Sequence, residues 1–588
     1  MKRRDFVAGG TKGVFVGLAG LGARPATPFV AATGRRADLV VRGGTILDGT
    51  GGPPRTGDIA IDGDRITQIG RGLAAGATEI DARDMAVAPG FIDIHSHADL
   101  SLLVNPRAES RVRQGVTLEV VGQDGSSIGP WSDGGFESTR DRYRRDFDVE
   151  IDFRDVGGFL DRIDRERPAV SVASMIGHGT IRSYVVGGAD RPATEAELER
   201  MRRMVRDALA QGAVGLSTGL EYTPGSFATR DELVALASEL RGTIYPYASH
   251  MRNEDDRLLA ALEEALHVGR VAGVAVQVSH LKAQGERNHW KAEAAFAAIE
   301  AARAAGVDVH FDRYPYVAYA TGLSNLFPAS ARAGGTARFL ARLADPETAP
   351  ALERACRDKI ALLGSWDAVQ ITRIGGANAA ARGRRLGELA TELGEDPYAL
   401  TVRLLRDANG SVGMIGFGMS EENTERMLAH PLGMVCSDGG AYAPYGALSR
   451  SSPHPRGYGS FPRVLGHYVR ERGAMPLETA VQKMSGLPAH KLGFADRGVL
   501  REGAAADVVV FDPDRVGDRA TFDDPHQYPE GIAHVVVGGV HTIRDEEQTG
   551  GMGGRAVRGG GPAADRPGSR GGGRRRGGRA RSRARRPR

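Results

Sequence analysis

The sequence predicts an α/β fold: a (β/α)8 TIM-like barrel, a small β-sandwich domain built from both chain ends, and an inserted lid subdomain. Three observations support this prediction. Eight short apolar runs alternate with segments that have the apolar spacing of helices, which is typical of parallel βα units. Strand-like alternating segments lie near both chain ends. The 588 residues, of which 41% are hydrophobic, suffice for one large domain with smaller additions.

The first 36 residues have the features of an export signal. Arg3 and Arg4 precede a polar residue and a phenylalanine, and the weakly apolar stretch VFVGLAGLG follows. Small residues near position 31 offer a cleavage site. This pattern resembles a twin-arginine signal, so we expect export to the periplasm or the extracellular space. The alternative is a basic N-terminus on a cytoplasmic protein.

Residues 37–88 and 495–548 share the pattern of a small β-domain. Both contain short alternating segments, such as DIAIDGDRITQIG and HVVVGGVHTI, bounded by Gly, Asp and Pro turns. We therefore expect the two ends to form one β-sandwich domain that flanks the central region.

The barrel is predicted over residues 89–494. Its eight candidate strands are 90–97, 116–124, 170–178, 213–218, 243–250, 274–280, 307–315 and 433–438. About 115 residues separate the last two strands, which is too long for a loop. An inserted subdomain is therefore predicted over about 320–412.

The final segment, 549–588, is predicted to be a disordered Arg/Gly-rich tail. Residues 551–588 contain 13 Arg and one Asp, so the net charge of +4 leaves the rest of the chain at −8. Arg/Gly tracts can bind nucleic acid through phosphates. This tail has no aromatic residue to stack on bases, so a solvated extension is favoured over nucleic-acid binding.

Composition excludes several classes of protein. Cys356 and Cys436 are the only cysteines, which excludes a disulfide framework, a Cys-rich zinc module and an iron–sulfur cluster. No apolar run reaches the roughly 18 residues of a membrane-spanning helix. No membrane association is therefore predicted, and nothing in the sequence indicates an oligomeric state.

Metal-ligand side chains end five of the predicted strands. They are His95 and His97, Asp124, His250, His280 and Asp438. Alone, each has an ordinary structural explanation, and an isolated His-x-His is more often structural. Together they lie at the carboxyl ends of barrel strands, where the active sites of such barrels form. Their side chains suit one or two divalent ions such as Zn²⁺.

The motifs GFIDIHSHAD, YASHMRNE, QVSHLK and SDGG resemble those of the amidohydrolase superfamily. GLSTGLEYTPG, DRYPY, HPRGYGSFPRVLGHYVRE and DPHQYPEGIAHVVVGG more closely resemble the N-acyl-D-amino-acid deacylases, or D-aminoacylases. The resemblance extends over about 37–548. It implies hydrolysis of an N-acyl-D-amino acid, a small molecule, to a D-amino acid and a carboxylate by metal-activated water.

The resemblance also implies roles for individual residues. His250 and His280 would hold the tighter metal, and His95, His97 and Asp438 would surround a second position. Asp438 would serve as the proton shuttle. Tyr222, Lys282 and Arg456 would bind the substrate carboxylate, and Tyr314 the acyl carbonyl.

Asp124 is the main departure from the family pattern. The D-aminoacylases have a Gly-Asn-Cys-Gly turn after the second strand, whereas this chain has Gly-Gln-Asp-Gly at 122–125. A carboxylate is a harder ligand than a thiolate but can still bind a divalent ion. Asp124 is therefore predicted as a metal ligand.

Two other functions remain as alternatives. One is hydrolysis of a cyclic amide, as in dihydropyrimidinases and hydantoinases, which usually have a carboxylated Lys between their metals. No Lys ends the third or fourth predicted strand here, which weakens this alternative. The other is nucleic-acid binding through the Arg/Gly tail.

Overall fold

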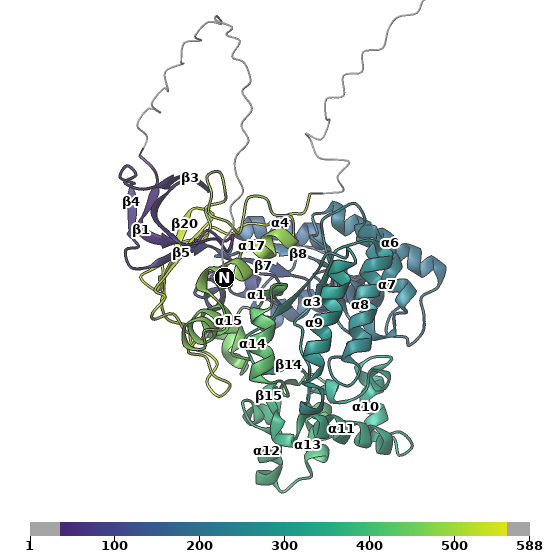
Figure 1. Ribbon diagram of the computed structural model, residues 1–588. Coiled ribbons are helices and arrows are strands. Elements are labelled where there is room, and N and C mark those ends of the chain that lie inside the picture. Colours follow the sequence, from purple (N-terminus) through teal and green to yellow (C-terminus); the bar gives the residue numbers. More distant parts are fainter. Residues whose placement is uncertain (1–35, 561–588) are drawn as a thin grey trace, which may run out of the picture. The chain divides into compact units, whose positions relative to one another are not determined.

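The computed structural model describes residues 36–560 (Figure 1). The predicted export signal lies outside these residues, except for its last position. Residues 561–588 of the predicted tail also lie outside them.

Eight parallel strand segments form the barrel, as predicted. They are β6 (Phe91–Asp93), β7 (Val116–Val121), β8 (Ser171–Ser174) with β9 (Ile176–Gly177), β10 (Leu216–Gly219), β11 (Tyr247–His250), β12 (Val276–Val278), β13 (Val309–Arg313) and β17 (Gly433–Val435). They pair in chain order, in the series β6-β7-β8 and β9-β10-β11-β12-β13-β17. Only Met175 separates β8 from β9, and its N–H donates to Val121 at 2.9 Å. Asp438 N donates to the His95 carbonyl at 2.9 Å, which joins the last strand to the first.

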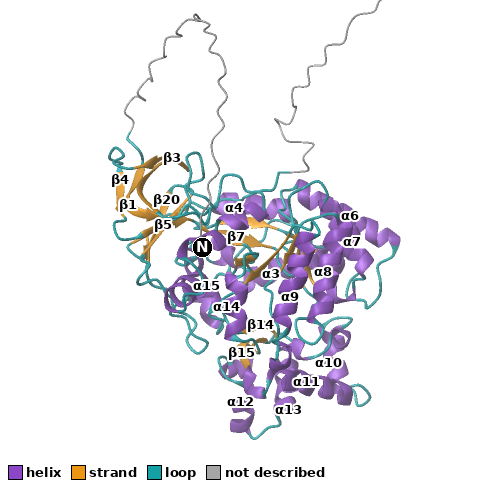
Figure 2. Cartoon of the chain, viewed as in Figure 1, coloured by secondary structure: helices purple, strands orange, loops and turns teal. Residues whose placement is uncertain are grey.

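Helices surround these strands (Figure 2). Among them are α4 (Val156–Glu166), α6 (Glu195–Ala210), α7 (Arg230–Ala237), α8 (Leu258–Ala272), α9 (Lys291–Ala304), α14 (Glu421–Ala429) and α16 (Leu477–Met484). Helix α6 begins at a capping box between Thr194 and Glu197 and buries Met201, Val205 and Leu209. Within 36–560, no helix has the length and apolar character needed to span a membrane.

The two ends of the chain share one β-domain. Strands β1 (Leu39–Ile46), β2 (Arg55–Asp62), β3 (Arg65–Gly70), β4 (Thr78–Asp81) and β5 (Ala86–Pro89) join β18 (Val508–Phe511), β19 (Ile532–Val537), β20 (Val540–Arg544) and β21 (Glu547–Gln548). The antiparallel pair β5–β18 connects the two sets, so β1, β5 and β20 appear close together in Figure 1. All nine strands belong to one hydrogen-bonded sheet, with a core of Val41, Ile59, Val87, Val510 and Val536 among others.

An inserted subdomain separates β13 from β17. Its sheet has the order β14 (Ala318–Gly322), β16 (Gly413–Phe417), β15 (Val369–Arg373). Helices α10 (Thr336–Ala344), α11 (Ala349–Leu363), α12 (Leu386–Leu393) and α13 (Pro397–Asp407) complete it. The sheet extends slightly beyond the predicted 320–412. Because β14 follows the carboxyl end of β13 closely, the subdomain starts at the end of the barrel where the candidate ligands lie.

Residues 549–560 differ from the predicted disordered tail. The Val557 N–H donates to the Val172 carbonyl at 2.7 Å, next to strand β8. Arg558 forms an ion pair with Asp164 of α4 at 2.6 Å. The prediction of disorder from 549 onward is therefore wrong for this segment. Backbone hydrogen bonds and ion pairs hold this segment, and Met552, Ala556 and Val557 pack against the hydrophobic core.

Candidate metal centre

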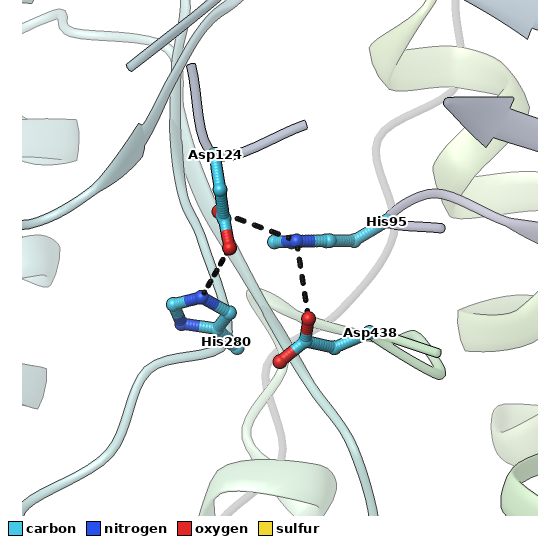
Figure 3. Close-up of side chains that lie close together, drawn as sticks. All are labelled: His95, Asp124, His280 and Asp438. Carbon is cyan, nitrogen blue, oxygen red and sulfur yellow. Dashed lines mark hydrogen bonds and ion pairs between the residues drawn. The ribbon is translucent and has the colours of Figure 1, made fainter. Parts of the chain in front are cut away.

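The six predicted ligand residues meet at the carboxyl end of the barrel. His95 and His97 follow β6, Asp124 follows β7, His250 ends β11, His280 follows β12 and Asp438 follows β17. One atom each from His95, Asp124, His280 and Asp438 lie within 4.8 Å of one another (Figure 3). These four side chains thus come from four strands and point toward a common centre.

The other two histidines adjoin this group. His250 Nδ1 lies 2.9 Å from His280 Nε2 and 3.4 Å from Asp124 Oδ2. His97 Nε2 lies 3.1 Å from Asp438 Oδ1. Asp124 therefore lies between the histidines, as expected for a shared ligand.

Three of the ligand residues have an unusual backbone conformation. Asp124, His280 and Asp438 have φ angles of 52°, 34° and 50°. Positive φ is uncommon for residues other than Gly, and it costs on the order of 1–3 kcal/mol unless the surroundings enforce it. Gly219 permits the turn at Asp124, because a Cβ on Gly219 would lie 2.0 Å from the Asp124 carbonyl oxygen.

The donor set fits a divalent cation. Nε2 of His95 and Oδ1 of Asp124 are buried, lie 3.3 Å apart and have no hydrogen bond of regular geometry within residues 36–560. Burial raises the pKa of the Asp124 carboxyl, but the charges of His95 and His280 lower it more, so it ends well below its ordinary value. Burial lowers the pKa of His250, yet the carboxylates of Glu254 and Asp124 raise it to about 10. The electrostatic field at this centre stabilises a positive charge. Imidazole and carboxylate groups are also the ligand types that suit Zn²⁺.

Three further carboxylates contact ring nitrogens of His95, His250 and His280. Asp312 Oδ1 lies 3.2 Å from His95 Nδ1, Glu221 Oε2 lies 3.2 Å from His250 Nε2, and Glu254 Oε1 lies 3.1 Å from His280 Nδ1. Asp312 and Glu221 can each accept the proton of one ring nitrogen, which leaves the other nitrogen of that ring free to bind a metal. At His280, Nδ1 lies between Glu254 Oε1 and Lys282 Nζ, which is 2.7 Å away, and Nε2 faces the metal centre. We expect these contacts to fix the orientation of all three rings.

Glu254 and Glu221 were not predicted as site residues. The sequence places Glu254 near the start of a helix, where it could simply favour the helix dipole. Helix α8 begins at Leu258, however, and Glu254 is only 2% exposed within the site. Its spacing of four residues from His250 was an available signal. Glu221 lies two residues after the end of β10 and could have been found by the same strand-end argument.

A cavity of about 610 Å³ opens onto the metal centre. Its walls include the predicted substrate-binding residues Tyr222, Lys282 and Arg456. Lys282 Nζ lies 2.6 Å from Glu254 Oε1, and Arg456 Nη1 lies 2.5 Å from Asp438 Oδ2. Burial lowers the pKa of Lys282, but the charge of Glu254 raises it above its ordinary value. Both cations are therefore charged.

Tyr222 and Tyr314 occupy different positions. Burial raises the pKa of Tyr222 well above its ordinary value, so its hydroxyl remains a neutral donor in the cavity wall. Tyr314 is fully buried and does not line the cavity. Its ring centre lies 4.8 Å from the Arg456 guanidinium and 5.9 Å from Lys282 Nζ. Tyr314 thus contacts the two cations, and its hydroxyl is buried without a hydrogen-bond partner in residues 36–560. Its contact with an acyl carbonyl stays a prediction.

The inserted subdomain adds Lys359 to the cavity wall. This lysine lies on α11, and its Nζ donates to Asp255 Oδ2 at 2.7 Å. The sequence gives no signal for it, because the strand-end argument finds only residues of the barrel.

Known proteins match most of the chain. A model of the amidohydrolase family matches residues 78–310 and 403–543. A D-aminoacylase from Alcaligenes xylosoxydans xylosoxydans is 36% identical over 521 residues, which cover 88% of this chain and 97% of the relative. An N-acyl-D-glutamate deacylase from the same organism is 40% identical over 505 residues, which cover 85% of this chain and 93% of the relative.

A solved structure shows the same similarity in three dimensions. It is the crystal structure of N-acyl-D-glutamate deacylase from Bordetella bronchiseptica, complexed with zinc and a phosphonate inhibitor that mimics the tetrahedral intermediate. It is 37% identical with a TM-score of 0.76, covering 89% of this chain and all of that one. A dihydropyrimidinase from Brevibacillus agri, at 15% identity and a TM-score of 0.51, shares the fold alone.

Proposed function

Because the chain belongs to the amidohydrolase family, and within it to the N-acyl-D-amino-acid deacylases, we propose that it is a zinc-dependent hydrolase of N-acyl-D-amino acids. The products are a D-amino acid and a carboxylate. One observation supports this most strongly. The cluster of His and Asp ligands faces the same cavity as two buried cations, Lys282 and Arg456.

A divalent ion at this centre lowers the pKa of bound water and polarises an amide carbonyl. Asp438 is the proposed proton shuttle. Burial raises its pKa, but Arg456 and then His280 lower it below the ordinary value, so the carboxylate is ionised and can accept a proton. Oδ2 already accepts from Arg456, so we assign the proton of water to Oδ1, which lies 3.1 Å from His97 Nε2 on the side of the ligand histidines. The C–O bond forms as this oxygen takes the proton from water, and the same oxygen then returns the proton to the leaving nitrogen as the C–N bond breaks.

The cavity wall supports an anionic substrate. Lys282 and Arg456 form charged contacts with Glu254 and Asp438, and both also line the cavity. The α-carboxylate of an acyl-amino acid can accept hydrogen bonds from these cations and from the neutral Tyr222 hydroxyl. This arrangement favours a linear substrate with a free carboxylate over a neutral cyclic amide.

Replacing Lys282 with Met tests this assignment. A hydrogen bond to a charged group contributes about 1.5–3 kcal/mol, so kcat/KM for an N-acyl-D-amino acid should fall about 10–150-fold. The corresponding N-acyl-D-amino acid amide, which lacks the carboxylate, should lose much less. Equal losses on both substrates would contradict the carboxylate-binding role.

We also propose that the protein is exported through a twin-arginine pathway. The support is Arg3 and Arg4 followed by a weakly apolar stretch. Replacing both arginines with lysine should retain the protein in the cytoplasm of its host, as measured by fractionation. Unchanged export of the variant would contradict the proposal.

A further inference from the structure

Two cavities adjoin the metal centre. A second cavity, of about 300 Å³, opens beside the first. The two share His97, Ala320, Thr321, Asp438 and Arg456 as wall residues. The proposed proton shuttle, Asp438, therefore lines both cavities.

The two halves of the substrate can be assigned to these cavities. Lys282 and Tyr222, two of the proposed partners of the α-carboxylate, line the first cavity and not the second. The amino-acid half then lies in the first cavity. Since the scissile C–N bond lies at Asp438, which lines both cavities, the second cavity is the space open to the acyl half.

The wall of the second cavity favours an anion. Asp438 is its only acidic wall residue, and it is already paired with Arg456. Arg373, at the end of strand β15, also lines this cavity. Its side chain is exposed and forms no ion pair or hydrogen bond with the rest of residues 36–560. Neighbouring Thr372 adds a hydroxyl to the wall.

We propose that the second cavity is the acyl subsite and that it binds an acyl group ending in a carboxylate, such as succinyl, through Arg373. This inference rests on the proposed deacylase activity and specifies its acyl group. An arginine can bind a carboxylate in a forked geometry, and here the inserted subdomain supplies it. The barrel would then bind the amino-acid half and hold the reacting groups, while the subdomain selects the acyl half.

The test compares N-succinyl and N-butyryl derivatives of one D-amino acid. Both acyl chains have four carbons, but only succinyl ends in a carboxylate. Because Arg373 is exposed, solvent weakens the contact, and we expect kcat/KM to favour succinyl by about two- to fivefold. Arg373→Met should abolish this preference. Arg354→Met is the matched control: Arg354 is exposed on α11 of the same subdomain and lines neither cavity, so the preference should persist.

Two results would overturn the acyl-subsite proposal: no preference for succinyl in the wild-type protein, or an equal loss on both substrates in Arg373→Met. Hydrolysis of N-acetyl-D-amino acids in the same assay would show that the deacylase activity itself stands. If no N-acyl-D-amino acid is hydrolysed, the proposed function fails as well.

Discussion

Glu254 links the metal centre to the substrate cations, so its replacement should disturb both. Oε1 of Glu254 lies 3.1 Å from His280 Nδ1 and 2.6 Å from Lys282 Nζ. Glu254→Gln keeps the size of the side chain but removes its charge. His280 then loses the carboxylate next to its Nδ1, and Lys282, which lies 2.7 Å from the same nitrogen, loses its counter-ion.

The magnitude follows from these two contacts. A hydrogen bond to a charged group contributes about 1.5–3 kcal/mol, and loss of a carboxylate behind a ligand histidine lowers metal affinity about 10–100-fold. We therefore expect zinc to bind Glu254→Gln about 10–100-fold more weakly. Titration of metal-depleted protein with Zn²⁺, in competition with a chelating indicator, measures this directly. At saturating zinc, KM for N-acyl-D-amino acids should still be raised, because Lys282 is no longer held in place.

Glu264→Gln is the matched control. Glu264 lies on α8, is 8% exposed and pairs with Arg252 at 2.9 Å, with no contact to a ligand histidine. Its replacement should leave zinc affinity and KM unchanged. Zinc affinity within twofold of wild type in Glu254→Gln would refute the positioning role.

Three other predictions concern single residues. Asp438→Asn should lower kcat about 10²–10⁴-fold while the protein keeps its fold by circular dichroism and much of its zinc; more than a tenth of wild-type activity would exclude Asp438 as the proton shuttle. Asp124→Asn should weaken zinc binding and Asp124→Cys should shift preference toward Zn²⁺ over Mn²⁺, whereas unchanged affinity and rate in Asp124→Asn would leave Asp124 a turn residue. Burial lowers the pKa of Lys483 to about 7 from its ordinary 10.5, so the unfolded chain binds one more proton than the folded protein between these values. Wild-type stability should therefore rise with pH in this window by about 1.4 kcal/mol per unit more than that of Lys483→Met, and parallel denaturation curves would contradict this.

The barrel could be predicted because each of its strands is a short apolar run between helical patterns. The predicted strands are nevertheless longer than the observed ones. Strand β12 ends at Val278, before His280, and β17 ends at Val435, before Asp438. Both ligand residues have positive φ, which is incompatible with a continuing strand. Composition and alternation do not report this local turn, so the sequence assigns the ligands to the strands themselves.

The ligand residues could be predicted because carboxyl ends of parallel strands meet at one end of a barrel. Residues that come to the centre from a turn or from the inserted subdomain could not be predicted in this way. Glu254 arrives through the turn before α8, and Lys359 arrives from the inserted subdomain. Their positions depend on how loops and subdomain pack, which no local pattern encodes. The order of segment 549–560 was not predicted for the same reason, because its partners are backbone groups and aspartates that are distant in the sequence.

The most direct test of the central claim is metal analysis of the purified protein together with hydrolysis of matched N-acetyl-D- and N-acetyl-L-amino acids. We expect at least one tightly bound zinc ion per chain, release of the D-amino acid, little release of the L-enantiomer, and loss of activity on chelation that added Zn²⁺ restores. Activity that survives complete metal removal, or equal hydrolysis of both enantiomers, would contradict the account of this protein as a zinc-dependent N-acyl-D-amino-acid deacylase.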